Sequence, residues 1–153
     1  GDWSSDVCSS DLRWQARNRD KPSHLESTCE AVSEQGDSFL IYMRQNKVLA
    51  DDFSCGIKWK IPDGDLVTIA RYNGSSHIHT NRADGKQIAF RCHIHQITLQ
   101  AIQNGWTAEN YAEPSDAFAS LEEAKVQLAK DFAIEGFVAK VHQLPLWNST
   151  SIN

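Results

Sequence analysis

The sequence predicts one α+β domain, in which an antiparallel sheet of about four or five strands carries two C-terminal helices packed on one face. Phe53 to Ile61 alternates apolar and polar residues with a period of two, which is typical of a strand. Leu121 to Phe132 carries an apolar stripe at helical spacing. The chain of 153 residues has the size of a single domain and is long enough to bury a core. We expect the domain at residues 38–136, between an N-terminal remnant at 13–37 and a C-terminal strand or tail at 137–153.

The first twelve residues, GDWSSDVCSSDL, are set apart from the fold prediction. Their last part, Asp6 to Leu12, looks like the in-frame translation of a common sequencing adapter, and Ser4–Asp6 nearly repeats as Ser9–Asp11. We expect residues 1–12 to be a non-native, adapter-derived tail, and a real N-terminal tail is the alternative. The true N-terminus, with any targeting signal it carried, is then missing from the sequence.

Charge, hydropathy and cysteine spacing exclude several classes of protein. The net charge is −5, and the leading tail contributes three of the aspartates, so the rest gives no support for a broad nucleic-acid-binding surface. No apolar run approaches the ~20 residues that span a bilayer. Cys29, Cys55 and Cys92 are widely spaced and lack a Cys-x-x-Cys motif. This spacing disfavours a disulfide scaffold or a cysteine zinc site and favours buried thiols in a reducing cytoplasm.

The N-terminal remnant begins with a basic, turn-prone stretch from Arg13 to Asp20, which we expect to form a loop. Ser23 and Glu26 have the spacing of a capping box at a helix N-terminus. Apolar residues fall at helical spacing after it. A short helix is therefore predicted over Ser23–Ser33.

A β-rich block follows, in which apolar and β-branched runs are separated by turn residues. Pro62 to Asp65 has turn chemistry and joins two of the runs into a predicted hairpin. Asn73 to Ser76 interrupts the pattern with a bulge or kink, and the chain resumes at His77. The predicted strands are Phe39–Met43, Phe53–Ile61, Leu66–Tyr72, a short stretch from His77, and Lys86–His95.

The C-terminal half of the domain is predicted to be helical. A first helix is expected over Gln96–Asn104, with Gly105 placed as its stop. Ser120 and Glu123 form a capping box for a second, amphipathic helix that extends toward Gly136. The remaining segments are a loop at Glu113–Asp116, a strand at Phe137–His142 and a frayed tail at Pro145–Asn153.

Four of the six histidines form two His-x-His pairs, His77/His79 and His93/His95. In a strand, residues two apart point to the same face, so each pair is a two-pronged imidazole fork. Imidazole binds metals and moves protons near neutral pH. The forks can form one site only if the strand register places them on a shared face, because a slip of one residue turns every side chain over.

Two turn lengths between the forks give opposite answers. A three-residue loop at Ala83–Gly85 places Ile78 in the core and both forks on the solvent-facing side, with His79 opposite Ala89. A two-residue Asp84–Gly85 turn would place the forks back to back. We expect the shared face, because burying Ile78 stabilises the fold by about 1.5–3 kcal/mol.

Three interpretations of a shared histidine face stay open. The first is a polar sheet surface that is rich in histidine without a chemical role. The second is a zinc site held by the four imidazoles. The third is acid–base chemistry without a metal, of the kind that 2′-OH attack on an RNA phosphodiester needs. The roles then assigned are acid and base for His77 and His93, support for His79 and His95, and phosphate binding for Arg71 and Arg91.

The run from Leu66 to Gly85, with Cys92–His95 and the predicted helix at Leu121–Ile134, resembles a group of small uncharacterised prokaryotic proteins that share a histidine hairpin. A looser similarity runs to TumE-type toxins of toxin–antitoxin pairs, which carry a related Asp-Asn…His-x-His hairpin before a short helix. The resemblance covers roughly residues 38–136, and the insert Trp106–Ser115 departs from it. The matching positions are Tyr72, Asn73, Gly74, His77, Asn81, Gly85, His93 and His95.

This resemblance implies a cytoplasmic, toxin-like protein of a prokaryotic mobile or defence locus, with a cognate antitoxin as partner and no membrane association. Together with the histidine face, it leads us to expect RNA as the substrate. The alternative is a non-enzymatic accessory or interaction domain, whose histidine face is structural or is stabilised by a metal such as zinc.

Overall fold

The computed structural model describes residues 3–4, 15–16 and 23–136. The adapter-like tail lies outside these residues except for Trp3–Ser4, and the strand and tail predicted after residue 136 lie outside them entirely. The strands are β1 (Trp3–Ser4), β2 (Gln15–Ala16), β3 (His24–Ser33), β4 (Ser38–Asn46), β5 (Phe53–Lys60), β6 (Leu66–Asn73), β7 (Ile78–Thr80), β8 (Gln87–Ala89), β9 (His93–Gln96) and β10 (Ala112–Pro114). The helices are α1 (Leu99–Gln103), the 3₁₀ helix η2 (Ala108–Asn110) and α2 (Leu121–Asp131).

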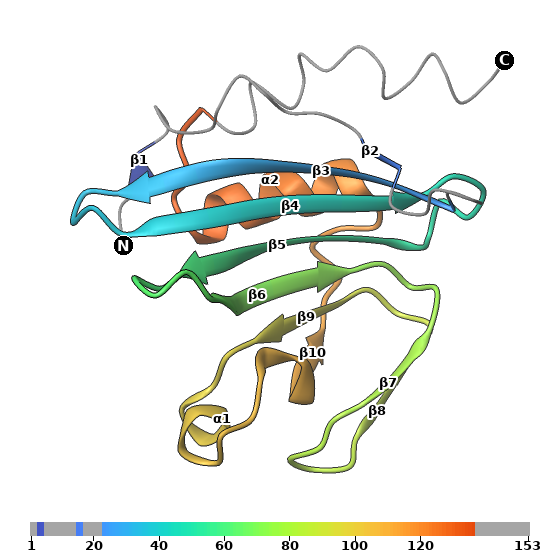
Figure 1. Cartoon of the computed structure of the whole chain (residues 1–153). Helices are drawn as coiled ribbons and strands as arrows, with labels where there is room; N and C mark the ends of the chain where they lie inside the picture. Colours follow the sequence, from blue (N-terminus) through green and yellow to red (C-terminus); the bar gives the residue numbers. More distant parts are fainter. Residues whose placement is uncertain (1–2, 5–14, 17–22, 137–153) are drawn as a thin grey trace, which may run out of the picture.

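The predicted α+β class is confirmed, with an antiparallel sheet as its main element. The sheet runs in the order β1-β3-β4-β5-β6-β9-β10, and β2 also pairs with β3. β7 and β8 form a separate two-stranded sheet, which projects beside β9 and β10 (Figure 1). The strands outnumber the four or five predicted, because short strands such as β2 and β10 extend the sheet at its edges.

Three central strands agree with the sequence pattern. β4 and β6 contain the runs predicted at Phe39–Met43 and Leu66–Tyr72, and β5 matches the predicted Phe53–Ile61 except for its last residue. β5 and β6 form the predicted antiparallel hairpin. The chain then bends at Gly74. A Cβ added there would lie 2.1 Å from the Asp51 carbonyl oxygen, so a glycine is required for this close approach.

The short helix predicted over Ser23–Ser33 is wrong, because this segment forms β3. Ser27, Cys29 and Ala31 are buried and alternate with exposed residues, which is the period of a strand. β3 pairs with β4 from His24↔Asn46 to Val32↔Ser38. These long-range hydrogen bonds override the local capping signal of Ser23 and Glu26.

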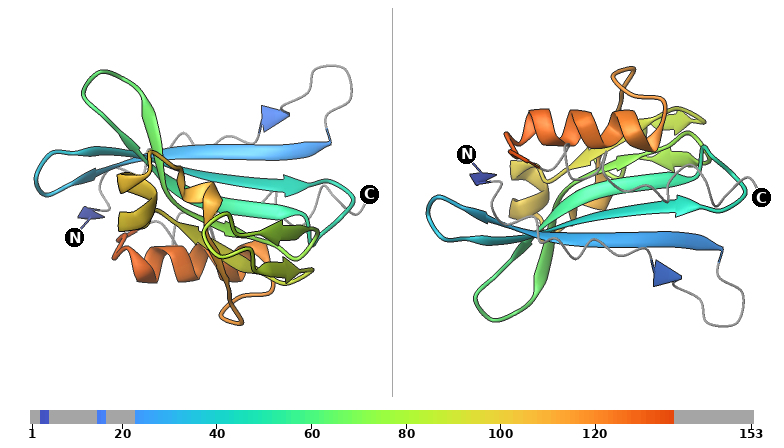
Figure 2. Two further views of the ribbon diagram at one scale, coloured as in Figure 1. Left: turned by 90° about the horizontal axis from the view of Figure 1, so that it is seen from below. Right: turned by 90° about the horizontal axis from the view of Figure 1, so that it is seen from above.

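The helices differ from the prediction in length and in what they cover. α1 is shorter than the predicted Gln96–Asn104, and Gly105 follows it with a φ of 66°, as a helix stop requires. The Ser120 side chain accepts a hydrogen bond from the Glu123 backbone N–H and caps α2 as predicted. The expectation of two helices on the sheet face is wrong: α2 packs on β5 and β6, whereas α1 follows the end of β9 (Figures 1 and 2).

The core lies between α2 and the face of the sheet that α2 covers. Apolar side chains from β3 to β6 meet Leu121, Ala124 and Leu128 of the helix. The Tyr72 hydroxyl donates a 2.6 Å hydrogen bond to Asp131 at the end of α2, and the Tyr72 ring lies 5.7 Å from that of Phe118. Among the described residues, no helix is long and apolar enough to cross a membrane.

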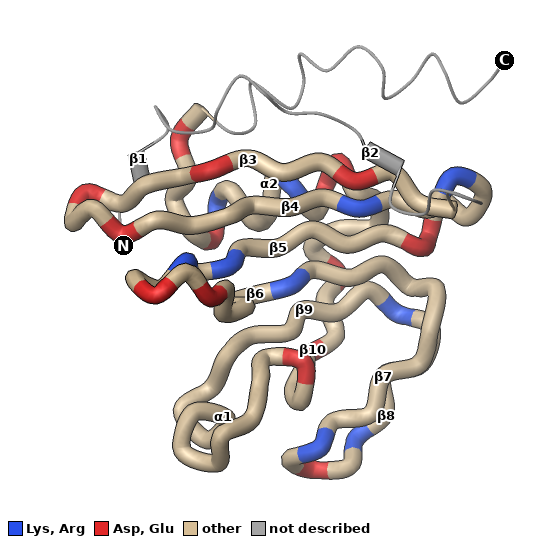
Figure 3. Tube along the Cα trace, in the orientation of Figure 1, with Lys and Arg blue, Asp and Glu red and all other residues tan. Residues whose placement is uncertain are grey.

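The opposite face of the sheet is polar and leads into the histidines. Cross-strand pairing places Glu26, Arg44, Ser54, Asn73 and His93 in one row across β3, β4, β5, β6 and β9. The neighbouring row holds Thr28, Tyr42, Gly56, Arg71 and His95. Basic positions lie on β4, β5 and β6, and acidic positions lie on β3 (Figure 3). The β-sheet therefore aligns charged and hydroxyl groups toward one end of this face.

We predict that Leu128→Ala lowers the free energy of unfolding by about 2–5 kcal/mol, because it leaves a cavity at a fully buried position of α2. Urea denaturation of the whole chain measures this change. Val126→Ala is the matched control, since Val126 lies on the same helix with 44% of its surface exposed. Equal losses in the two variants would contradict the packing described for α2.

Candidate functional site

The four histidines of the two forks form one contiguous cluster. The ring centroid of His93 lies 5.0 Å from that of His77, 5.7 Å from that of His79 and 5.1 Å from that of His95. The rings of His79 and His95 are 4.5 Å apart and nearly perpendicular. We call these four residues the histidine cluster. The expected meeting of the forks is therefore found, although the route to it differs from the prediction.

The predicted strand Lys86–His95 is broken into two strands, β8 and β9. Phe90 lies at the break with a φ of 51°, a left-handed conformation that is costly for a residue with a side chain. The chain thereby leaves β7, and β9 pairs with β6 instead, with His93 opposite Asn73 and His95 opposite Arg71. The second fork thus belongs to the main sheet, and the first belongs to the separate hairpin.

The register predicted for the first fork is also wrong. His79 lies opposite Ile88 rather than Ala89, and the loop is closed by a backbone hydrogen bond from Asn81 to Lys86. Neither the three-residue nor the two-residue turn forms. The reason is that Ile78 is 50% exposed and Ile88 is the buried isoleucine, so burial of Ile78 does not fix the register.

The cluster has a buried half and an accessible half. His93 and His95 are 0% and 2% exposed, so the expectation that both forks face solvent is wrong for this pair. His77 is exposed and His79 is half-buried. Only the hairpin fork is accessible to a substrate, while the sheet fork lies beneath it.

A directed chain of hydrogen bonds fixes the protonation of His93. Arg71 has only donors, and its Nε donates to Asn73 Oδ1 at 2.9 Å. The Asn73 amide nitrogen therefore faces His93 Nε2, at 3.3 Å, and that ring nitrogen must accept. His93 Nδ1 in turn donates to the Arg91 carbonyl oxygen at 2.8 Å. His93 is consequently a neutral imidazole with its proton on Nδ1.

A second amide orients His79. Asn81 Nδ2 donates to the Ala112 carbonyl oxygen at 2.9 Å, and Asn81 Oδ1 accepts from the Ala112 N–H at 2.8 Å. The same Oδ1 lies 3.0 Å from His79 Nε2, which must therefore donate. His79 Nδ1 stays available to take up a proton without loss of this hydrogen bond.

Burial keeps the remaining imidazoles neutral near pH 7. Burial lowers the pKa of His95 to about 4, against the opposing effect of Glu109, whose carboxylate lies 3.9 Å from His95 Nε2. His95 Nδ1 is buried and has no hydrogen-bond partner among the described residues. The pKa of His77 and that of His93 are also lowered, first by burial.

The two arginines predicted to bind phosphate have different ion-pair partners, and only the side chain of Arg71 lies beside the histidine cluster. Arg71 pairs with Glu109 at 3.2 Å and lies in the row of His95. Arg91 pairs instead with Asp116 at 3.2 Å, and its side chain is 53% exposed. Sequence reasoning missed Glu109, because η2 carries it from a distant part of the chain and no motif marks it. Tyr72 lies on the α2 face rather than beside the histidines.

The arrangement of donor atoms does not favour the zinc interpretation. Within the described part of the chain, no group of three or more His, Cys, Asp or Glu could hold a metal ion. The hydrogen bonds explain this result: His93 Nε2 faces Asn73, and His79 Nε2 faces Asn81. The cluster is thus held by amide and carbonyl partners.

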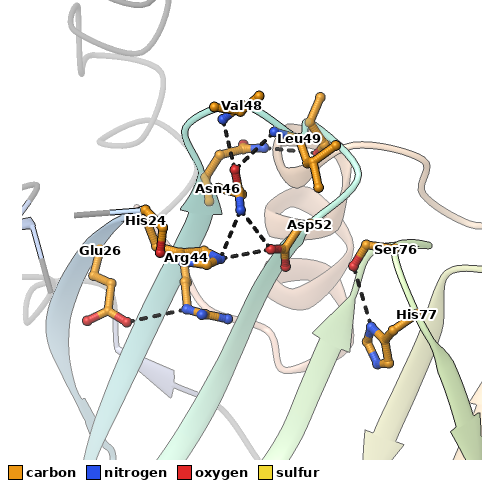
Figure 4. A network of polar contacts seen from close by, with 12 residues as sticks. His24, Glu26, Arg44, Asn46, Val48, Leu49, Asp52, Ser76 and His77 are labelled. Atoms are coloured by element: carbon orange, nitrogen blue, oxygen red, sulfur yellow. Dashed lines mark hydrogen bonds and ion pairs between the residues drawn. The ribbon is translucent and has the colours of Figure 1, made fainter. Parts of the chain in front are cut away.

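A separate polar network lies at the neighbouring corner of the sheet (Figure 4). His24 Nε2 lies 2.8 Å from Asp52, which also accepts from Asn46 at 3.1 Å. Asn46 Oδ1 accepts from the backbone N–H groups of the loop after β4. This network joins the end of β3 to the β4–β5 connection, and its sequence signal was too dispersed to be recognised.

Comparison of the chain with protein-family models, curated proteins and solved structures found no match. The site is therefore interpreted from its own geometry.

We predict that stability falls between about pH 7.5 and about pH 4, and that His95 contributes strongly to this fall. The folded-state pKa of His95 lies below the ordinary value of 6.5, so the unfolded chain binds more protons as the pH drops. The loss assigned to His95 is on the order of 3 kcal/mol at the lower pH. Urea unfolding of wild type and His95→Gln at both pH values measures it. An equal pH dependence in the two proteins would contradict the burial of a neutral His95.

Proposed function

We propose that the histidine cluster is the acid–base centre of a toxin-like protein that cleaves RNA. The observation that carries this proposal is the contact of two accessible imidazoles, His77 and His79, with a buried neutral pair beneath them. Acid–base catalysis of transesterification needs one group that takes the 2′-OH proton and another that gives a proton to the leaving 5′ oxygen. Arg71, beside the cluster, supplies a cation for the phosphate.

The exposed fractions of the histidine side chains change which two of them we assign as the catalytic pair. His93 was expected to act with His77, but it is fully buried and its ring nitrogens are both engaged. His79 takes its place, because its Nδ1 carries no obligatory partner and its ring is half-buried. His93 and His95 then position the catalytic pair.

The proposed reaction is a transesterification with two proton transfers. Neutral His77 takes the proton of a ribose 2′-OH, and the 2′ oxygen forms a bond to phosphorus. The bond from phosphorus to the 5′ oxygen breaks, and protonated His79 gives its Nδ1 proton to that leaving oxygen. The products are a 2′,3′-cyclic phosphate and a free 5′-OH, and no further reactant is needed.

A toxin of this kind implies a partner and a genetic setting. We propose that a small antitoxin encoded beside the gene binds the protein and blocks the accessible fork. The setting is a prokaryotic mobile or defence locus, and the site of action is the cytoplasm, where RNA is present. These assignments rest on the resemblance of the histidine hairpin to TumE-type toxins.

The second candidate is a non-enzymatic accessory or interaction domain. The specific observation that favours it is the burial of both sheet histidines, His93 and His95, with His93 hydrogen-bonded on both ring nitrogens to Asn73 and to the Arg91 carbonyl oxygen. Buried polar networks specify a fold when all members are satisfied. Under this alternative the cluster holds the hairpin to the sheet, and substitution of an accessible histidine changes no chemical activity.

We predict that His77→Ala lowers the rate of RNA cleavage by about a hundredfold or more, because general acid–base groups contribute that much. Cleavage of a single-stranded RNA by the purified chain, with detection of the cyclic phosphate, measures the rate. Thr80→Ala is the matched control, since Thr80 is exposed on the same hairpin and lies outside the cluster. Equal rates in wild type and His77→Ala, or no cleavage by wild type, would rule out the proposed reaction.

Expression of the chain alone is predicted to arrest bacterial growth, and His77→Ala is predicted to relieve the arrest. The reason is that RNA cleavage without antitoxin removes templates for translation. Growth curves after induction, with protein levels matched by immunoblot, test this outcome. Unimpaired growth at wild-type protein levels would count against the toxin and in favour of the interaction domain.

A further inference from the structure

A groove lies on the polar face of the sheet, next to the histidine cluster. Its volume is about 290 Å³, and it extends across β3, β4, β5 and β6 to Arg71 and Glu109. Both of these residues also belong to the surroundings of the cluster, where Glu109 pairs with Arg71 and approaches His95. The groove therefore ends at the Arg71–Glu109 ion pair, which borders the cluster.

Two buried polar atoms in the groove lack hydrogen bonds. Ser54 is only 2% exposed, and its hydroxyl has no hydrogen-bond partner among the described residues. Arg44 Nε is likewise buried without a hydrogen bond from the described part of the chain. Ser54 and Arg44 are direct cross-strand neighbours. Leaving such groups unpaired is costly, so a pair of them in one groove indicates the place of a ligand.

The chemistry of these groups selects an anion. Arg44 offers only donors, and a serine hydroxyl can also donate, so the ligand must present acceptor oxygens. Arg44 is held by Glu26 only at 3.6 Å, which is longer than a hydrogen bond. Lys58 and Arg71 also line the groove, so three cations face two carboxylates there. In Figure 4 the Arg44 guanidinium extends along the sheet face from β4 in the direction of β5.

We infer that this groove is a phosphate-binding site, in which Arg44 and Ser54 hold a phosphate oxygen each and Arg71 faces the scissile group. The inference deepens the proposed function and rests on it for the source of the phosphate, the backbone of a single-stranded RNA. Ser54 lies opposite Asn73, which bonds His93, so only β6 separates a phosphate on Ser54 from the strand of His93. Arg44 thereby takes the role that the sequence suggested for Arg91.

The test measures phosphate binding apart from cleavage. Inorganic phosphate is titrated into the full chain by calorimetry, and a single-stranded 2′-deoxy oligonucleotide, which cannot be cleaved by this route, is titrated separately. We expect wild type to bind both, and Ser54→Ala and Arg44→Gln to weaken both affinities about tenfold or more. Lys60→Gln, an exposed position on the same strand, is expected to bind as wild type does.

The outcomes separate the two proposals. Lack of phosphate binding by wild type, or unchanged affinity in the Ser54 and Arg44 variants with unaltered melting temperatures, overturns the groove assignment. Phosphate binding without oligonucleotide binding overturns the RNA backbone as its source and points to a free phosphate or nucleotide. Phosphate binding that depends on Ser54, in a protein that cleaves no RNA, supports the groove while the proposed reaction fails. His77→Ala is expected to abolish cleavage and retain phosphate binding.

Discussion

The arrangement of the site depends on the side chain of Asn81. This amide donates to the Ala112 carbonyl oxygen and accepts from the Ala112 N–H, as the backbone of a neighbouring strand would. Asn81 is only 4% exposed. Among the described residues, the β7–β8 hairpin shares no strand pairing with the main sheet, so side-chain contacts such as this one join the two sheets. Arg82 strengthens the junction through its backbone bond to Asn110 and its position 4.9 Å above the Trp106 ring. Because β10 pairs with β9, fixing the hairpin on β10 also fixes the first fork over the second.

The same amide also orients the accessible fork. Asn81 directs the His79 proton to Nε2, while Asn73 requires an unprotonated Nε2 on His93. Four imidazoles at van der Waals distance would repel one another if charged, and burial adds a desolvation cost for each charge. Asn73 reduces that conflict because it fixes a neutral tautomer on the buried His93. The protein thereby gathers four titratable groups without a compensating acidic cluster, and Glu109 is the carboxylate placed near them.

The parts of the fold that could be predicted from sequence are those fixed by local periodicity. β5, β6 and the start of α2 follow from alternation, turn residues and the Ser120 cap. β3 could not be predicted in this way, because the capping signal at Ser23 is local and the pairing with β4 is not. Nothing in the sequence marks Phe90 as a left-handed residue, so the break between β8 and β9 was not foreseen. Residues two apart on a strand did converge as expected, but through pairing with β6.

The sequence identified the histidines of the candidate site correctly, but it did not predict which of them are buried or what each one does. The histidines could be selected because each fork shares a face in any register, whereas exposure depends on which sheet carries each fork. His93 and His95 became interior residues because β9 lies between β6 and β10. The contributions of Glu109, Arg44 and Ser54 come from contacts between distant segments, and their sequence neighbours give no indication of them.

The central claim is that His93 and His95 are neutral within the contacting histidine cluster, His93 through its hydrogen bonds and His95 through burial. Long-range ¹H–¹⁵N NMR of the imidazole rings at about pH 7 tests it directly, since it distinguishes both tautomers and the charged form. We expect His93 as the Nδ1–H tautomer, with a carbonyl-bonded Nδ1, and His95 as a neutral ring that resists protonation well below pH 6.5. A protonated His93, an Nε2–H tautomer of His93, or four independent titrations near the ordinary pKa would contradict the account.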